Sequence, residues 1–88
     1  GCYIDSIDLR TLRQTFYFDR TGMTIEGCQQ FCTEAGYSIA GLEYSDQCFD
    51  CDTTIRESSS IADSSNCFMP CAGNSGQICG GPNHLSIY

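Results

Sequence analysis

Eight cysteines in a chain of 88 residues constrain what this sequence can fold into more than any other feature. At this length a hydrophobic core alone leaves a domain only marginally stable. Each disulfide in a small secreted domain adds about 2–5 kcal/mol, so four would match much of a total stability of about 5–15 kcal/mol. An even cysteine count in a short chain therefore favours paired half-cystines and an oxidising, extracellular compartment.

The charge balance excludes two classes of partner. Four basic residues stand against eleven acidic ones, which gives a formal net charge of −7. Proteins that bind nucleic acid or anionic lipid neutralise phosphate groups with clustered basic side chains. We therefore expect no nucleic-acid partner and no membrane contact by this domain itself. No apolar run reaches the length of a transmembrane helix.

One helix is predicted between Thr24 and Gly36. The apolar residues of one helical face recur three and four positions apart: Cys28, Phe31, Cys32 and Ala35. Thr24 can cap the helix N-terminus, and Glu26 in the first turn complements the helix dipole. Gly36 is the expected stop, because glycine readily adopts the left-handed conformation that ends many helices.

Several short strands are predicted around this helix. They lie in the stretches GCYIDSIDL, YSIAGLEYS and LSIY. RTLRQTFYFDRTG is read as a loop with at most one short strand, and QCFDC as a short strand or a tight corner. In YSIAGLEYS, Ala40, Leu42 and Tyr44 fall on one face by the two-residue period of a strand. The polar stretch 52–66 is predicted to be an exposed loop, and the stretch CFMPCAGNSGQICGG is predicted to consist of turns.

The cysteine spacing leaves a metal site as an alternative. Three pairs have the spacing of zinc ligands: Cys28 and Cys32, Cys48 and Cys51, and Cys67 and Cys71. A site with four thiolates would leave four thiols unused, so disulfides are favoured and no cofactor is expected. A redox dithiol at Cys48 and Cys51 is disfavoured, because neighbouring negative charge raises a thiol pKa. Three aspartates flank this pair without forming a calcium loop: Asp46, Asp50 and Asp52.

No catalytic constellation is visible in the sequence. His84 is the only histidine, and its neighbours Pro82 and Asn83 indicate a surface loop. There is no nucleophile elbow and no metalloprotease motif, and the acidic residues are scattered rather than paired. We expect a domain that is not an enzyme.

The aromatic residues are more informative about function. Phe31 lies on the predicted cysteine face of the helix and is expected in the core. Tyr44, Phe49 and Phe68 instead lie beside residues rich in Asp, Asn and Gln. Aromatic rings flanked by planar polar groups suit a sugar, which has C–H faces and hydroxyl edges. The alternative is that these rings only cover the disulfides.

Taken together, several motifs resemble the WSC domain. They are the opening GCYID, Arg10 and Leu12 spaced as Arg-x-Leu, the run MTIEGCQQFCTEAGYSIAGLEYSDQCF, the turn PCAGNSGQICGG and the closing LSIY. The WSC domain is the cysteine-rich module of fungal cell-wall stress sensors. It also occurs in secreted fungal enzymes and in animal Kremen and polycystin-type proteins. The resemblance covers essentially the whole chain, so a single domain over residues 1–88 is expected.

The resemblance implies a fold and a disulfide pattern. The fold is a small α+β, PAN/apple-like unit in which one helix packs on a short antiparallel sheet. The family pairing, carried over to this sequence, gives four bonds: Cys2–Cys67, Cys28–Cys48, Cys32–Cys51 and Cys71–Cys79. Residues four apart share a helix face, so a strand with two cysteines can be bonded to both Cys28 and Cys32.

The resemblance also implies a function. WSC domains bind cell-wall carbohydrate, such as β-1,3-glucan, chitin or a related polysaccharide, or a glycoprotein glycan, in an extracellular or cell-surface setting. The expected ligand residues are six: Tyr44, Gln47, Phe49, Asp50, Phe68 and Asn74. The alternative is a protein-interaction module that self-associates through the same aromatics, because a fold alone does not decide function.

One departure from the family concerns Cys48 and Cys51. The family pattern is Cys-aromatic-Cys-Gly-Asn, whereas this chain has one more residue between the cysteines and Asp52 in place of the glycine. A β-bulge, which places one extra residue in a strand, can absorb the insertion and re-aim Phe49 or Asp50.

Overall fold

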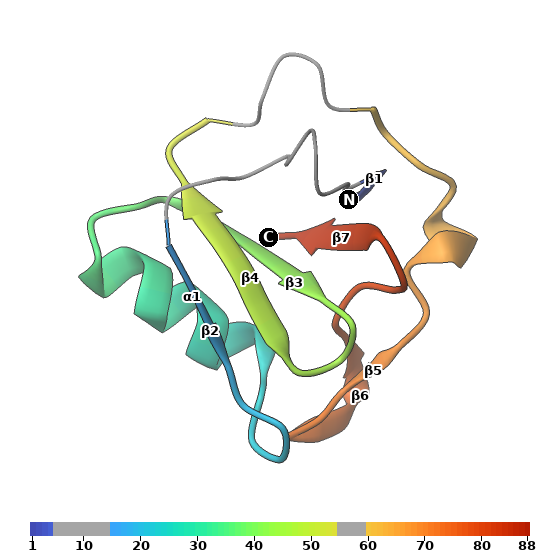
Figure 1. The fold of residues 1–88 in the computed structure, drawn as a ribbon, viewed down its shortest axis with the longest axis horizontal. Helices are drawn as coiled ribbons and strands as arrows, with labels where there is room; N and C mark the ends of the chain where they lie inside the picture. Colours follow the sequence, from blue (N-terminus) through green and yellow to red (C-terminus); the bar gives the residue numbers. More distant parts are fainter. Residues whose placement is uncertain (5–14, 55–59) are drawn as a thin grey trace.

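A computed structural model describes residues 1–4, 15–54 and 60–88. One helix, α1 (Ile25–Glu34), packs against a five-stranded antiparallel sheet with the strand order β1-β7-β3-β4-β2 (Figure 1). The strands of this sheet are β1 (Cys2–Ile4), β2 (Thr15–Phe18), β3 (Ile39–Glu43), β4 (Gln47–Asp52) and β7 (His84–Ile87). This arrangement confirms the predicted α+β class and the single main helix.

A second, two-stranded sheet stands beside the first. It consists of β5 (Pro70–Cys71) and β6 (Asn74–Ile78), and a short 3-10 helix over Ser64–Asn66 precedes it. The sequence predicted only turns over residues 67–81. β5 has only two residues, and β6 is polar and mostly exposed, so neither shows the alternation of a half-buried strand. The disulfide between Cys71 and Cys79 joins the two.

The helix begins and ends as its sequence predicts. Thr24 is the N-cap, and its side-chain oxygen accepts a hydrogen bond from the Gly27 N–H at 3.0 Å. At the other end Gly36 has a φ of 95°, and its N–H donates to the Thr33 carbonyl. The Tyr37 N–H donates to the Cys32 carbonyl at 2.8 Å. These two bonds form a Schellman motif, which explains why the helix stops here.

The insertion in β4 is absorbed by a register shift, as predicted. Cys48 lies opposite Leu42 and Cys51 lies opposite Ala40, so three steps along β4 match two steps along β3. In a regular strand residues three apart point to opposite faces. The register shift brings both cysteines back to the same face of the sheet, and both half-cystines lie buried in one core with Leu42 and Ala40.

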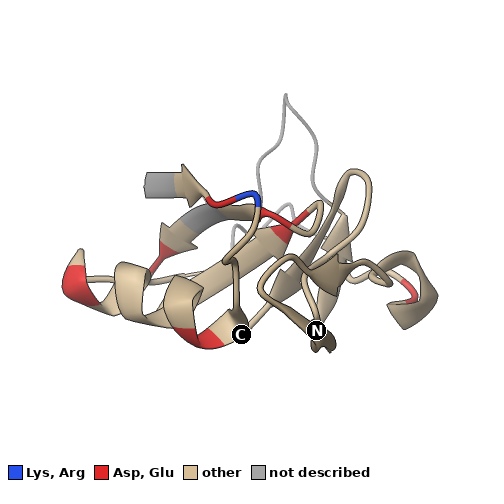
Figure 2. Ribbon diagram, turned by 90° about the horizontal axis from the view of Figure 1, so that it is seen from below, with Lys and Arg blue, Asp and Glu red and all other residues tan. Residues whose placement is uncertain are grey.

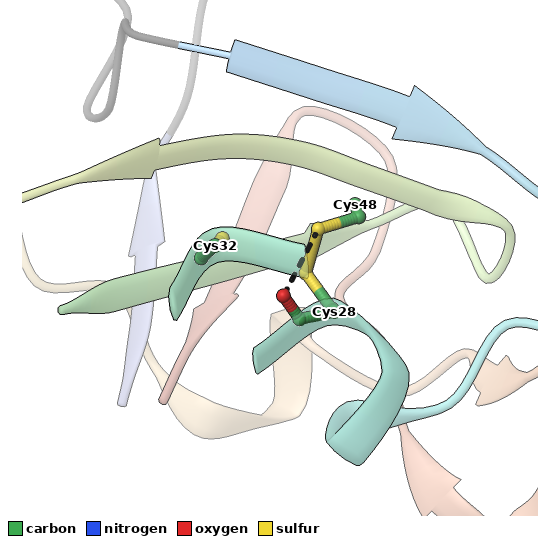
Figure 3. Close-up of side chains that lie close together, drawn as sticks. All are labelled: Cys28, Cys32 and Cys48. Atoms are coloured by element: carbon green, nitrogen blue, oxygen red, sulfur yellow. Dashed lines mark hydrogen bonds between the residues drawn. A yellow bond between two sulfur atoms is a disulfide. The ribbon is translucent and has the colours of Figure 1, made fainter. Parts of the chain in front are cut away.

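All four disulfides implied by the family pairing are present, with Cα–Cα distances between 4.8 and 5.9 Å. The sulfurs of Cys28, Cys32 and Cys48 lie within 4.8 Å of one another (Figure 3), close enough for a metal site. Each of them is bonded to another sulfur, however, and so offers no thiolate ligand. Two adjacent disulfides explain the zinc-like spacing of Cys28 with Cys32 and of Cys48 with Cys51, whereas Cys67 and Cys71 pair separately with Cys2 and Cys79.

The other half of the sheet brings both ends of the described chain together. The Gly1 amine donates to the Ile87 carbonyl at 3.0 Å, and the Ile87 N–H donates to the Gly1 carbonyl at 2.8 Å. Leu85 and Ile87 form a second small core with Tyr3 and Ile39 packed against it. β1, the first strand, therefore forms one edge of the sheet and pairs there with β7, the last strand.

The side chain of Gln77 connects the two-stranded sheet to the helix. Its amide oxygen accepts from the Ile25 N–H at 3.0 Å, and its amide nitrogen donates to both carboxylate oxygens of Glu26 at 2.8 Å. Ile25 opens the helix, so this contact satisfies one of the N–H groups that a helix leaves unpaired. The hydrogen bond from Gln77 lowers the pKa of Glu26.

Removing the extra residue of β4 tests the register argument. A variant lacking Asp50 has the regular Cys-x-Cys spacing, which places both cysteines on one face without a bulge. We expect both disulfides to the helix to form, and the melting temperature to be unchanged or higher. Mass spectrometry after alkylation under non-reducing conditions checks the bonds.

A matched control lengthens the same segment. A glycine inserted after Asp50 separates the two cysteines by about 13 Å along a regular strand, whereas Cys28 and Cys32 are about 6 Å apart along the helix axis. This variant should show alkylated thiols. Free thiols in the shortened variant instead would contradict the register argument.

The contact between Gln77 and Glu26 should make stability depend on pH. Because the folded-state pKa of Glu26 is lowered, its contribution is complete above the ordinary carboxyl pKa and is lost as pH falls through the lowered value. We expect urea midpoints measured between about pH 5 and pH 2 to fall less steeply in Glu26→Gln and Gln77→Leu. The pKa of Asp63 is also lowered, by hydrogen bonds from Ser65. Asp63→Asn should therefore remove a separate part of the pH dependence of the urea midpoint. Equal slopes in wild type and in Gln77→Leu would show that the contact is not formed in solution.

Candidate functional site

Three segments meet at the lower end of the sheet in Figure 1 and form a surface that we call the rim. The rim consists of Phe18–Asp19, Tyr44–Gln47 and Ala72–Asn74. The Asp19 N–H donates to the Asp46 carbonyl at 2.9 Å, and the Ala72 N–H donates to the Ser45 carbonyl at 3.0 Å. The Gly73 N–H donates to the Met23 carbonyl at 2.7 Å, which ties the third segment to the start of the helix.

Tyr44 stands on a turn with an unfavourable backbone conformation. The φ angles of Tyr44 and Ser45 are 56° and 75°, in the left-handed region that non-glycine residues adopt at a cost of about 1–2 kcal/mol each. The Ser45 N–H donates to the Cys79 carbonyl, and the Ser45 hydroxyl donates to the Pro70 carbonyl. The second sheet therefore fixes a turn that would otherwise relax, and the turn presents a tyrosine that is 51% exposed.

The placement of Tyr44 corrects one expectation from the sequence. The two-residue period put it on the same strand face as Ala40 and Leu42, which are indeed buried. The strand ends at Glu43, however, and Tyr44 belongs to the turn that follows. The next residue of this turn, Ser45, bonds to Cys79 and Pro70, more than 20 residues away in sequence, and a local pattern does not reveal such contacts.

The remaining predicted ligand residues divide into three groups. Gln47, which is half-buried, and Asn74, which is exposed, both lie on the rim with Tyr44. Phe68 is 59% exposed but lies outside the rim, one residue after Cys67. The side chains of Phe49 and Asp50 lie outside the described part of the structure, so their predicted role stays a prediction.

Phe18 belongs to the rim but was not among the predicted ligand residues. It lies opposite Gln47 in the pairing of β2 with β4, and it is 54% exposed. Its neighbour Tyr17 packs on Phe31 of the helix, with ring centroids 4.5 Å apart. Since successive strand residues face opposite sides, an inward Tyr17 places Phe18 outward. The three consecutive aromatic residues of TFYF do not alternate, so no signal of this was available in the sequence.

The rim is acidic and lacks a catalytic arrangement of the kind sought in the sequence. Asp19 and Asp46 contribute carboxylates, and Arg20 is the basic residue among those that the structure describes (Figure 2). One oxygen of Asp19 accepts from the N–H groups of Thr21 and Gly22, so it stabilises a turn. Burial, and then the charge of Asp19, raises the pKa of Tyr17. His84 begins β7, and its Nδ1 lies 2.7 Å from the Pro82 carbonyl oxygen.

Comparison with known proteins identifies the family. The WSC domain family model matches residues 1–81. This chain belongs to the WSC domain family. It is 43% identical over 88 residues to a WSC domain-containing protein of Arthroderma benhamiae, 34% identical over 88 residues to xylosyltransferase oxt of Drosophila melanogaster, and 32% identical over 88 residues to human Kremen protein 2. Each match covers 100% of this chain.

This WSC domain spans only a small part of the length of these relatives: 9% of the fungal protein, 10% of the xylosyltransferase and 19% of Kremen protein 2. The same kind of domain is thus found within proteins of quite different description. In the part of this WSC domain that the structure describes, no helix is long and apolar enough to cross a membrane.

The conformation of the Tyr44 turn predicts how substitutions there behave. Glycine adopts a positive φ freely but adds entropy to the unfolded chain, so Tyr44→Gly should change the free energy of unfolding by less than about 1 kcal/mol. Tyr44→Val should destabilise more than glycine does, because a β-branched residue fits a positive φ least well. Urea denaturation measures both. Greater destabilisation by glycine than by valine would disprove the strained turn.

Proposed function

We propose that this WSC domain is an extracellular, cell-surface module without catalytic activity that binds neutral cell-wall polysaccharide through the rim. The supporting observation is the exposed pair of aromatic side chains, Phe18 and Tyr44, beside the polar groups of Asp46, Gln47 and Asn74. Aromatic faces stack on the C–H faces of sugar rings, and carboxylate and amide groups bind their hydroxyls. The ligands we propose are β-1,3-glucan, chitin or a related polysaccharide.

Rigidity supports the rim as a binding surface. The Tyr44 turn is held by backbone bonds to the second sheet, and that sheet is closed by Cys71–Cys79 and connected to the helix through Gln77. A ring that is already fixed loses little conformational entropy when a ligand binds. Strained backbone that the surrounding structure enforces is characteristic of functional sites.

Charge supports a neutral ligand. The chain carries a net charge of −7, and the rim contains the carboxylates of Asp19 and Asp46. A uronic acid or phosphate polymer would be repelled, whereas neutral glucan or chitin would not be. The occurrence of this domain type within a protein named as a xylosyltransferase, which by that name acts on sugar, is compatible with a carbohydrate ligand.

A pull-down on insoluble β-1,3-glucan and chitin tests the proposal. Tyr44→Gly and Phe18→Ala should each lower the retained fraction of protein by about three- to tenfold, the range for loss of one aromatic contact. Ile61→Ala is the matched control, because it removes a side chain that is 78% exposed outside the rim. Unchanged retention of both rim variants, with all four disulfides intact, would refute the rim.

The second candidate function is a protein-interaction or self-association module. Phe68 and Ile61 are exposed apolar side chains outside the rim, 59% and 78% exposed, and suit contacts between proteins. Sedimentation velocity at several concentrations separates the two functions. Self-association that is lost in Phe68→Ala and indifferent to added oligosaccharide would favour this candidate over carbohydrate binding.

A further inference from the structure

A hollow of about 210 Å³ lies where β1 pairs with β7, and none of the rim residues line it. Cys2 lies opposite Ser86 in the pairing of β1 with β7, and the Cys2–Cys67 disulfide adds Cys67 to the lining. Ile78 and Tyr88 also line it. The hollow is thus assembled from four parts of the chain that are distant in sequence.

The walls of this hollow are fixed. The Tyr88 hydroxyl donates to the Ile78 carbonyl at 3.0 Å, which holds the ring against β6. The Tyr88 backbone exchanges two hydrogen bonds with Ala40, each 2.8–3.0 Å long. The Ser86 hydroxyl oxygen accepts from the Gly80 N–H at 3.0 Å, so its own proton remains to be donated. A ligand would meet a preformed surface, which reduces the entropy lost on binding.

The lining is chemically specific. It combines an aromatic ring that is 42% exposed and an aliphatic side chain that is 37% exposed, Tyr88 and Ile78, with two serines, Ser64 and the buried Ser86. No charged side chain is among its lining residues, and the amine of Gly1, which is one of them, donates to the Ile87 carbonyl. Its volume is below the range of about 300–1,000 Å³ for pockets that hold drug-sized molecules. The occupant should therefore be small, with apolar faces and hydroxyl groups, and the net charge of −7 disfavours an anionic one.

We propose that this hollow, which we call the Tyr88 pocket, is a second carbohydrate site that takes one neutral pyranose ring. The proposal rests on the proposed function of the rim but concerns different residues. Two sites on one rigid domain let a polysaccharide bind at both, and the second contact then forms at a high effective concentration. A single sugar should bind weakly at the Tyr88 pocket, whereas a polymer should be held far more tightly.

Titration of the protein with methyl β-glucoside and with N-acetylglucosamine, followed by amide NMR, tests the pocket directly. We expect at least one of these sugars to shift the amide signals of Cys2, Cys67, Ser86 and Tyr88 in a saturable way. Glucuronate, which is similar in size but charged, should shift them much less. Because wild-type protein is used, the mapping does not depend on whether a variant folds.

Variants connect the shifts to the ring. Tyr88→Ala should weaken monosaccharide binding by about tenfold, whereas Tyr88→Phe, which keeps the ring, should retain most of it. Tyr44→Gly and Ile61→Ala should leave the pocket shifts unchanged. Saturable shifts confined to rim residues would overturn the second site and leave the proposed function intact. Pocket shifts that depend on protein concentration and not on sugar would assign the hollow to self-association and overturn the proposal as well.

Discussion

Two parallel disulfides between one helix and one strand are the constraint on which the rest of this structure depends. Cys28 and Cys32 lie about 6 Å apart along the helix axis, and Cys48 and Cys51 face Leu42 and Ala40, which are two residues apart on the neighbouring strand. Two bonds fix both the position and the direction of the helix on the sheet, which one bond would not do. Cys48 and Cys51 must therefore point to the same face of the sheet, and the bulge in β4 follows from that requirement.

This constraint also positions the rim. Because β4 is fixed to the helix, the turn that precedes it and the strand β2 that pairs with it are fixed as well. The Glu26–Gln77 contact then holds the second sheet against the helix N-terminus, and that sheet maintains the strained Tyr44 turn. Four disulfides and a small core thus support this surface.

Local signals in the sequence predicted the local structure well. The helix limits followed from Thr24 and Gly36, since capping depends on neighbouring residues. The disulfide pairing came from the resemblance to the WSC domain, because spacing alone allows many pairings. The direction of Tyr44 and the Tyr88 pocket could not be predicted. Both are produced by contacts between segments remote in sequence, such as Ser45 with Cys79 and Cys2 with Cys67.

The disulfide pattern also determines how the domain would carry a mechanical load. A pull on Gly1 and Tyr88 first breaks the hydrogen bonds between Gly1 and Ile87 and then reaches Cys2. From there the covalent path crosses to Cys67, and it crosses again from Cys71 to Cys79 before it leaves through β7. The helix, β3 and β4 lie off this path. Once the hydrogen bonds of Ile87 with Gly1 and of Tyr88 with Ala40 are broken, tension on the two ends would therefore extend only a short length of chain.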